Sequence, residues 1–380
     1  MTKLTGVKMA YRKLAIIFSF FLLGSIPTCL CGALPDPIGP PKLRVAIGLD
    51  QSEVSLGGPN GIEIIDGATG ETLLDEAGPE LHQIRSTQSL LIVRGLHGSL
   101  VDANSRRYRG QIEIRPNQNG KLDVINVLDI EDYLYGVMKP EISPNWPREA
   151  VKVQAVTART FALYQKMKNQ GKDWDLSATA LSQVYGGFYS EDPMSNECVD
   201  QTRGVIITYQ DKPILAQYHA ACGGRTENAK NVWGVELPYL QSISCPFCKD
   251  SPHYRWTARV SLREIAQSLN KGGLNVGKIY SIQSLAKSGS GRITELKIVQ
   301  SRGNEIISGN EFRLLLGPQK IRSTLFTMRM AGGDVIFDGR GWGHGAGMCQ
   351  WGAKKLAEDG YDYKHILRYY FKDVKIEKLK

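Results

Sequence analysis

The chain has 380 residues, of which 42% are hydrophobic and 22% are charged. This composition excludes a disordered or low-complexity protein and predicts a globular chain of about two domains. The formal net charge of +9 suits an anionic partner such as a cell wall or lipid headgroups, although simple solubility explains it equally well. The sequence contains no recognised DNA- or RNA-binding motif, so no nucleic-acid partner is predicted.

The N-terminus has the layout of a targeting segment. Its early basic residues end at Lys13, and no charged residue follows until Asp36. Residues 1–33 are therefore predicted to be a secretory signal peptide or, if they are retained, a membrane anchor. Either reading places the rest of the protein outside the cytoplasm, in the periplasm or the cell envelope. Residues 34–42 are rich in proline and are predicted to be a linker.

Residues 43–128 are predicted to form a β-rich N-terminal part. Apolar and polar residues alternate in the segments "LRVAIGL", "SLLIVRG", "YRGQIEIRP" and "KLDVINVLDI", which Gly, Asn and Pro separate. Asn119-Gly120 supplies the positive φ that a hairpin turn uses.

Residues 129–380 are predicted to form a second part that contains helices. The clearest helix runs from Pro147 to about Asn169, with Pro147 at its first position. Ser261 and Ser308 begin two further helices, because each is followed three residues later by a glutamate. Strands and helices do not alternate in a βαβ rhythm, so the predicted fold class is α+β.

The glycine-rich stretch 339–353 lies between a predicted strand and a predicted helix, as a dinucleotide-binding loop does. Its glycines alternate with other residues, however, and the G-x-G-x-x-G spacing with a later acid is absent from the sequence. No organic cofactor is predicted.

Four blocks of the sequence carry a family pattern. They read "LDIEDYLYGVMKPEISPNWPREAVKVQAVTARTFAL", "LSQVYGGF", "YHAACGGRTENAKNVWGVELPYLQS" and "GRGWGHGAGMCQWGAKKLAEDGYDYKHILRYYF". In this order they resemble the SpoIID/LytB family, named after stage II sporulation protein D and the amidase enhancer LytB. The resemblance covers about residues 44–378 and implies a mixed SpoIID-like fold whose catalytic core lies within 129–380.

The family resemblance implies an activity and several site residues. The activity is lytic cleavage of peptidoglycan glycan strands stripped of stem peptides, in sporulation or division, with a cell-wall amidase as partner. The family's catalytic glutamate falls at Glu141, its basic pair on the next helix falls at Lys152 and Arg159, and a family tyrosine falls at Tyr239. A basic stripe on a helix more often faces solvent, and a buried structural ion pair is the alternative for Arg159.

The residues around Glu141 are compatible with acid catalysis. Cleavage of a glycosidic bond requires protonation of a poor leaving oxygen, and a glutamate in an apolar site has the raised pKa that this needs. Pro140, Ile142 and Trp146 are near it in the sequence. A lytic transglycosylase uses one carboxyl as acid and then as base. The alternative is that Glu141 is a solvated turn residue.

Five residues, including Tyr239, are candidates for sugar binding, because sugars accept stacking and amide contacts: Gln183, Tyr185, Tyr239, Trp342 and His344. For each aromatic residue, packing in the core is the alternative role. The "GWGHG" loop that carries Trp342 and His344 has a structural alternative too, since glycines allow two backbones to approach closely.

A separate set of residues indicates a metal site. His219 with Cys222 and Cys245 with Cys248 form two pairs of potential ligands, each with two residues between its members, as in tetrahedral structural zinc sites. The resemblance agrees, since some family members carry zinc with His and Cys ligands in this block. A Cys245–Cys248 disulfide is the alternative in an exported protein.

Two other functions remain open from the sequence. As an amidase enhancer, the protein would bind glycan without cleaving it. As an ordinary glycoside hydrolase, it would need a second carboxylate, and Glu131 or Asp132 would be the source.

Overall fold

The computed structural model describes residues 41–179 and 182–379, so the predicted targeting segment and most of the linker lie outside the described residues. Within these ranges no helix is long and apolar enough to cross a membrane. The chain divides into two compact units. The insert unit is Arg255–His344, and the main unit consists of the described residues on either side of it. No division falls near residue 128, because the strands before it and the helices after it share one hydrophobic core.

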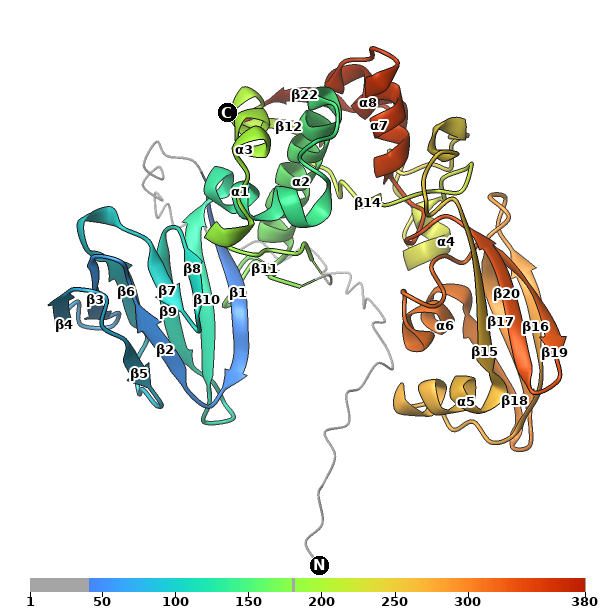
Figure 1. The fold of residues 1–380 in the computed structure, drawn as a ribbon, viewed down its shortest axis with the longest axis horizontal. Helices are drawn as coiled ribbons and strands as arrows, with labels where there is room; N and C mark the ends of the chain where they lie inside the picture. Colours follow the sequence, from blue (N-terminus) through green and yellow to red (C-terminus); the bar gives the residue numbers. More distant parts are fainter. Residues whose placement is uncertain (1–40, 180–181, 380) are drawn as a thin grey trace, which may run out of the picture. The chain divides into compact units, whose positions relative to one another are not determined.

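The main unit begins with two sheets, whose strands are drawn in blue and teal in Figure 1 except for β11, which is green. Neighbours pair antiparallel except β1 with β11. The larger sheet contains, in spatial order, β11 (Leu176–Ser177), β1 (Lys42–Gln51), β10 (Leu122–Asp129), β9 (Gln111–Pro116), β6 (Leu91–Gly95), β3 (Gly61–Asp66) and β4 (Thr72–Ala77). The smaller contains β5 (His82–Ile84), β2 (Val54–Gly57), β7 (Val101–Ala103) and β8 (Arg106–Tyr108).

Helices form the other part of the main unit, and α2 contacts most of them. The α-helices are α1 (Ile130–Glu141), α2 (Arg148–Lys168), α3 (Pro193–Gln201), α4 (Ala229–Trp233), α7 (Gln350–Glu358) and α8 (Tyr363–Tyr370). The 3₁₀ helices are η1 (Leu96–Gly98), η2 (Phe188–Ser190) and η3 (Pro246–Cys248). Alanines on α2 bury a face with little side-chain volume, which lets neighbouring elements pack closely against its backbone.

Two small sheets tie the C-terminus into the main unit. In one, β12 (Val205–Tyr209) lies between β13 (Lys212–Pro213) and the last strand, β22 (Lys375–Lys378). In the other, β14 (Tyr218–His219) pairs in parallel with β21 (Met348–Cys349). The segments before and after the insert unit are thus joined within one core.

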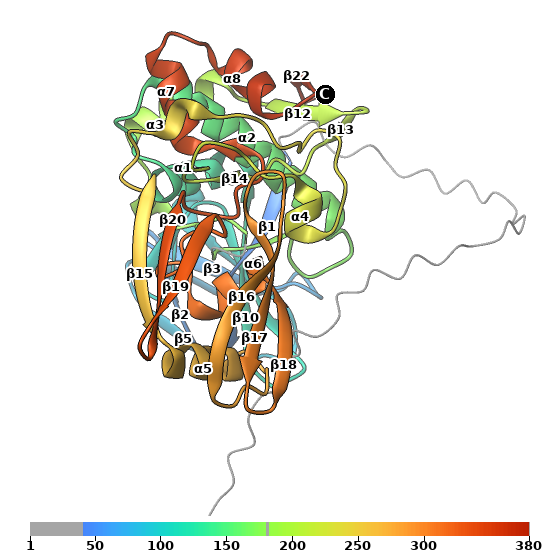
Figure 2. The same ribbon diagram turned by 90° about the vertical axis from the view of Figure 1, so that its right-hand side faces the viewer.

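The insert unit has its own core, built around residues such as Phe312 and Phe337. Its two three-stranded sheets are seen in Figure 2, and α5 and α6 lie on one side of its strands in Figure 1. One sheet is β15 (Arg255–Ser261), β20 (Asp334–Arg340) and β19 (Phe326–Ala331), and the other is β16 (Ile279–Lys287), β17 (Ile293–Gln300) and β18 (Gly303–Ser308). The helices are α5 (Leu262–Lys271) and α6 (Gly309–Leu316).

The α+β class, the β-rich N-terminal part and several local signals are confirmed. The Ser261 and Ser308 hydroxyls accept hydrogen bonds from the backbone N–H groups of Glu264 and Glu311, at 3.1 Å each, and so cap α5 and α6. Gly120 has a φ of 68° in the β9–β10 turn. The predicted helix from Pro147 is α2, with Pro147 as its N-cap.

Candidate active site

Glu141 is the last residue of α1, a helix whose buried face is formed by Ile130, Tyr133, Leu134, Val137 and Met138. These residues recur at the three- and four-residue spacing of a helix with one face in the core. The sequence did not predict α1, because a proline stands in its last turn.

The proline in α1 leaves a backbone acceptor for a neighbouring loop. Pro140 has no N–H, so it cannot make the hydrogen bond that a helix would direct to the carbonyl of Gly136. That carbonyl accepts instead from the backbone N–H of Gly186, at 3.1 Å. The Gly136 carbonyl, which is left without a helical donor, therefore binds the loop 182–187 to the end of α1.

Gly136 also makes room for this loop. A Cβ at that position would lie 2.5 Å from Cε2 of Tyr185, which is closer than any side chain tolerates. With the loop packed here, the backbone N–H of Val184 donates to Oε1 of Glu141 at 3.0 Å. The helix and the loop together hold the carboxyl group in one orientation.

A chain of buried polar side chains leads to the same carboxyl group. The Tyr133 hydroxyl donates to Oε1 of Gln183 at 3.1 Å, and Nε2 of Gln183 donates to the Tyr218 hydroxyl at 3.1 Å. The Tyr218 hydroxyl is in turn hydrogen-bonded to Glu141. Since the Gln183 amide fills the acceptor side of the Tyr218 hydroxyl, the hydroxyl proton is available for the carboxylate.

The electrostatics of Glu141 follow from its burial. Desolvation raises the pKa of its carboxyl group, and the hydrogen bonds from Val184 and Tyr218 oppose that rise without cancelling it. Burial also raises the pKa of the Tyr218 and Tyr133 hydroxyls well above the usual range, and the nearby Glu141 carboxylate adds to the effect. Both tyrosines therefore stay protonated at neutral pH and act as donors.

The glycine-rich stretch near the C-terminus supplies another contact with Glu141. Nε2 of Gln350 donates to the backbone carbonyl of Glu141 at 3.3 Å and to Oε1 of Gln154 at 3.2 Å. Gln350 directly follows β21. Gly347, just before β21, has a φ of 74°, and a Cβ at this position would lie 2.1 Å from the carbonyl oxygen of Gln217. Glycine is therefore needed here for β21 to pair with β14. Gly347 thus allows these two backbone segments to approach closely.

The two basic residues of the predicted site have protein partners. Arg159 has no exposed side chain: its guanidinium forms an ion pair with Glu131 at 2.7 Å and also donates to the carbonyl of Val205 at 3.0 Å. The buried ion pair left open by the sequence is thus what the structure shows, and the Arg159 side chain is shielded from solvent. Nζ of Lys152 is 2.7 Å from Oε1 of Glu149, and its side chain is 19% exposed.

Three of the expected sugar-binding residues are buried. Gln183 belongs to the polar chain that ends at Glu141, so it acts through Tyr218. Tyr185 packs against Tyr133 and donates to Oδ1 of Asn126 at 2.8 Å. The Tyr239 hydroxyl accepts from the backbone N–H of Leu215 at 3.2 Å. For Tyr185 and Tyr239 the alternative of core packing applies.

Trp342 and His344 belong to the insert unit, at its C-terminal end. The guanidinium of Arg322 lies over the Trp342 ring, 5.2 Å from its centroid. A role of these two residues in binding sugar stays a prediction.

The acids considered as a second carboxylate lie at the other end of α1. A helix rises about 1.5 Å per residue, so Glu131 and Asp132 are roughly 14–15 Å from Glu141 along the axis. Paired carboxylates of glycosidases lie about 5–10 Å apart. The ion pair with Arg159 also occupies Glu131. Neither acid is therefore placed to assist Glu141.

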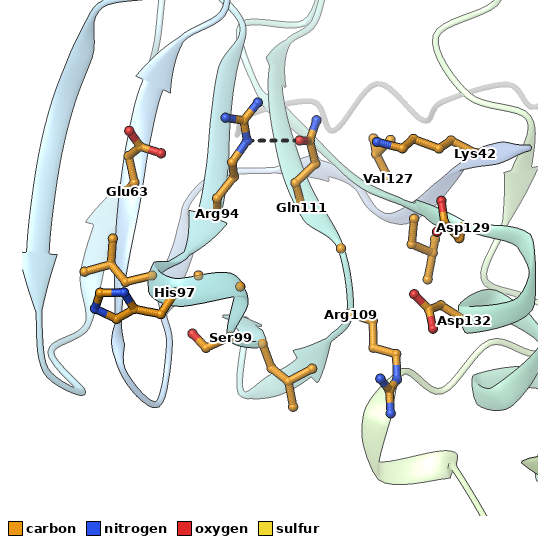
Figure 3. A pocket seen from close by; sticks show the side chains of 16 residues that line it. Lys42, Glu63, Arg94, His97, Ser99, Arg109, Gln111, Val127, Asp129 and Asp132 are labelled. Carbon is orange, nitrogen blue, oxygen red and sulfur yellow. Dashed lines mark hydrogen bonds between the residues drawn. The ribbon is translucent and has the colours of Figure 1, made fainter. Parts of the chain in front are cut away.

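Asp132 instead lines a cavity of about 480 Å³ on the larger sheet, shown in Figure 3. Side chains of both charges surround it, among them Arg94 and Asp129. Nε of Arg94 donates a hydrogen bond to Gln111. Burial raises the pKa of Asp132. Among the described residues that line the cavity there is none of the expected site residues, so it is separate from the surroundings of Glu141.

The predicted metal ligands are brought together only in part. Cys222, Cys245 and Cys248 lie in one cluster, but its fourth member is Cys349 and not His219. Nδ1 of His219 is 3.1 Å from the backbone carbonyl of Ala346. No disulfide joins cysteines within the described chain. A mixed His–Cys zinc site, as the resemblance implied, does not fit this arrangement.

Sequence reasoning missed Tyr218, Gln350 and Cys349. Each has a signal in the printed sequence: Tyr218 directly precedes His219 in "YHAAC", and Cys349 and Gln350 are neighbours in "GMCQWGA". The pairing of β14 with β21 that brings them together joins segments on either side of the insert unit, which the local sequence does not reveal.

Comparisons with known proteins match two regions of the chain to family models. Residues 118–209 match a family model described as "Stage II sporulation protein". Residues 247–347 match a model described as a domain of unknown function (DUF8618), and this range corresponds closely to the insert unit.

Relatives align over most of the chain. An uncharacterized protein of Brachyspira hyodysenteriae is 36% identical over 83% of this chain and 84% of its own length. The stage II sporulation protein D of Bacillus amyloliquefaciens is 30% identical over 66% of this chain and 74% of its own length. An amidase enhancer of Bacillus subtilis is 29% identical over 63% of this chain, but only 39% of that protein is covered.

Proposed function

The chain belongs to the SpoIID/LytB family, and from this premise we propose that it remodels the cell wall as a peptidoglycan lytic transglycosylase. Its substrate would be glycan strands stripped of stem peptides, cleaved between MurNAc and GlcNAc. The observation that carries the proposal is the state of Glu141. Its carboxyl group is held by Val184 and Tyr218, and burial raises its pKa toward the range in which it donates a proton at neutral pH.

One carboxyl group is sufficient for the proposed reaction. Protonated Glu141 donates its proton to the glycosidic oxygen as the C1–O bond breaks, and the leaving sugar departs as an alcohol. The resulting carboxylate takes the proton from the C6 hydroxyl of MurNAc, whose oxygen bonds to C1 and closes the 1,6-anhydro ring. Glu141 is protonated again at the end, and no water is consumed. The distance to Glu131 and Asp132 along α1 favours this route over a two-carboxylate hydrolysis.

Tyr218 and Gln350 have positioning roles in this proposal. The Tyr218 hydroxyl stabilises the carboxylate between the two proton transfers, and Gln350 fixes the end of α1 through the Glu141 carbonyl. Neither role requires the residue to touch the sugar.

Location and partners are part of the same proposal. The expected targeting segment would bring the protein to the cell envelope, membrane-bound if that segment is retained. The similarity to an amidase enhancer supports a cell-wall amidase as partner. The same similarity supports the second candidate function, in which the protein binds glycan and stimulates the amidase without cleavage.

The test is a digest of peptide-free glycan strands by the wild type and by Glu141→Gln, analysed by mass spectrometry. We expect fragments ending in 1,6-anhydroMurNAc from the wild type, and a rate lower by about 10²- to 10⁴-fold for the variant, since amide nitrogen cannot donate the proton. Glu113→Gln is the control, because Glu113 is a buried acid of β9 paired with Arg115.

The other outcomes separate the alternatives. Ordinary reducing ends would contradict the transglycosylase and identify a hydrolase. Intact strands that still bind the folded wild type would contradict catalysis and favour the enhancer.

A further inference from the structure

Four buried cysteine side chains of the main unit meet at one point. Their Sγ atoms all lie within 4.8 Å of one another, and each residue is at most 1% exposed. They come from three segments: Cys222 follows β14, Cys245 and Cys248 are at η3, and Cys349 ends β21. Local sequence alone does not bring them together.

The spacing of the sulfurs suits a single tetrahedral metal ion. Zinc–sulfur bonds of about 2.3 Å place the sulfurs of a tetrahedral site about 3.8 Å apart. Sγ of Cys222 and Sγ of Cys248 are 3.4 Å apart, and the whole set is compact enough to close around one ion with small adjustments.

Backbone donors around the cluster favour thiolates. The N–H of Gly224 is directed at Sγ of Cys222, and the N–H of Gly352 at Sγ of Cys349, each at 3.4 Å. Such donors stabilise the negative charge of metal-bound sulfur. Gly352 has a second reason to be glycine, since a Cβ there would lie 2.8 Å from Sγ of Cys245 and 2.2 Å from the Tyr370 hydroxyl.

We propose that Cys222, Cys245, Cys248 and Cys349 bind one Zn²⁺ ion in a closed structural site, with His219 outside it. The set of four sulfurs fills the tetrahedron without an imidazole, and a closed site leaves no position for substrate or water. Binding converts the thiols to thiolates and releases their protons, so the site forms more readily as pH rises.

The cysteine cluster is connected to the surroundings of Glu141 through β14 and β21. Tyr218, which is hydrogen-bonded to Glu141, lies on β14, and Gln350, which contacts the Glu141 carbonyl, directly follows Cys349. Cys222 and Cys349 are also linked by a hydrogen bond from the Cys222 N–H to Sγ of Cys349, at 3.3 Å. The metal would fix the pairing of β14 with β21, and hence the position of both Glu141 partners.

The first experiment measures metal in the full chain, purified under reducing conditions, by inductively coupled plasma mass spectrometry. We expect one equivalent of zinc per chain. Replacement by Co²⁺ is expected to give the absorption of tetrahedral cobalt with thiolate ligands, including sulfur-to-metal charge transfer. Both readings use the wild type and need no substrate, so failure of the digest would leave this inference standing.

Three variants test the identity of the ligands. Cys349→Ser is expected to lose stoichiometric zinc and to change the cobalt spectrum. His219→Ala is expected to keep one equivalent. Cys198→Ser is the matched control, because Cys198 is a buried cysteine of α3 outside the cluster, with its Sγ 3.9 Å from the Arg148 carbonyl.

Any of three results would overturn the inference. One is a reduced wild-type protein that neither contains zinc nor takes it up on titration. Another is loss of metal in His219→Ala but not in Cys349→Ser. Disulfides among the four cysteines would be detected as a loss of two hydrogens of mass for each bond, and would also contradict the site.

Discussion

At the scale of single residues, the protonation of Glu141 depends on opposing effects. Burial raises the pKa of its carboxyl group, while donors from Val184 and Tyr218 lower it. The native state then holds this proton more tightly than the unfolded chain does. The contribution of Glu141 to the free energy of unfolding is therefore fully present below the ordinary glutamate value of 4.5 and is lost as pH rises through the native pKa. In the proposed reaction the same rise keeps the acid form available at higher pH.

Substitution Tyr218→Phe is expected to move the upper pH limit of activity. Loss of the hydroxyl removes a donor that favours the carboxylate, so the pKa of Glu141 rises further and the fall of kcat/KM with pH shifts upward. At neutral pH we expect kcat to decrease about tenfold, since a hydrogen bond to a charged group contributes about 1.5 kcal/mol or more. Steady-state rates across pH on peptide-free glycan are the measurement.

The control for Tyr218→Phe is Tyr135→Phe. Tyr135 is on the same helix as Glu141, but its hydroxyl donates to Asp200 at 2.7 Å. An unchanged pH profile for Tyr218→Phe, or an equal shift in the control, would contradict the link between Tyr218 and the acid.

At the scale of elements, the loop 182–187 packs against the end of α1, and the two together position Glu141. Pro140 frees the Gly136 carbonyl for Gly186, and the missing side chain of Gly136 admits the ring of Tyr185. Two residues that are poor in helices for different reasons thus dock the loop whose Val184 N–H holds Glu141. The end of α1 therefore has a low helix propensity, and the same two residues allow the loop to pack against it.

Gly136→Ala is expected to disturb the site although alanine favours helix. The new methyl group would lie 2.5 Å from the Tyr185 ring and push the loop away, at a cost of about 1–3 kcal/mol in the free energy of unfolding. Activity is expected to fall with it, because the loop carries Val184. Chemical denaturation and the glycan digest measure the two effects.

A double-mutant cycle supplies the control for Gly136→Ala. In a Tyr185→Leu background the ring is absent, so adding Gly136→Ala is expected to cost little. Additive effects of the two substitutions would show that the contact between Gly136 and Tyr185 is not the cause.

Elements with a local signal were predictable and the others were not. The capping residues Ser261 and Ser308 and the Asn119-Gly120 turn act within a few residues, so the sequence alone identified them. Helix α1 was missed because a proline normally ends a helix at or before the preceding residue, whereas Pro140 lies in the last turn of α1. Glu141 was predicted as the acid from its family motif. The surroundings of Arg159 could not be predicted, because they depend on Glu131, which only the tertiary structure brings into contact with it.

At the scale of the whole molecule, the protein has two separate hydrophobic cores. The core of the insert unit draws only on residues between Trp256 and Phe337, and the other core draws on the chain before and after them. The glycine-rich stretch 339–353 contains the end of the insertion, but no comparable stretch marks its start near Arg255, so the two boundaries could not be paired from the sequence. Each core has the closed set of contacts expected of a cooperative unit.

Matched substitutions should therefore affect different thermal transitions. Phe312→Ala in the insert unit and Phe371→Ala in the main unit each remove a fully buried ring, at about 3–5 kcal/mol. We expect differential scanning calorimetry to resolve two transitions, with each variant lowering one of them. A single transition that both variants lower equally would contradict independent cores.

The nesting of one unit inside the other affects the order of folding. The hydrogen bond from Cys222 to Cys349, next to the pairing of β14 with β21, joins residues 127 positions apart, so forming this pairing from an open chain closes a long loop. In the folded insert unit, Arg255 pairs with Arg340, which brings the two ends of the insertion together. Folding the insertion first shortens the effective loop and lowers the entropic cost of closure by about 1 kcal/mol. Gln350, which contacts the Glu141 carbonyl, follows the insertion in the chain, so the surroundings of Glu141 are incomplete until the segment after the insertion has been synthesised and has paired with β14.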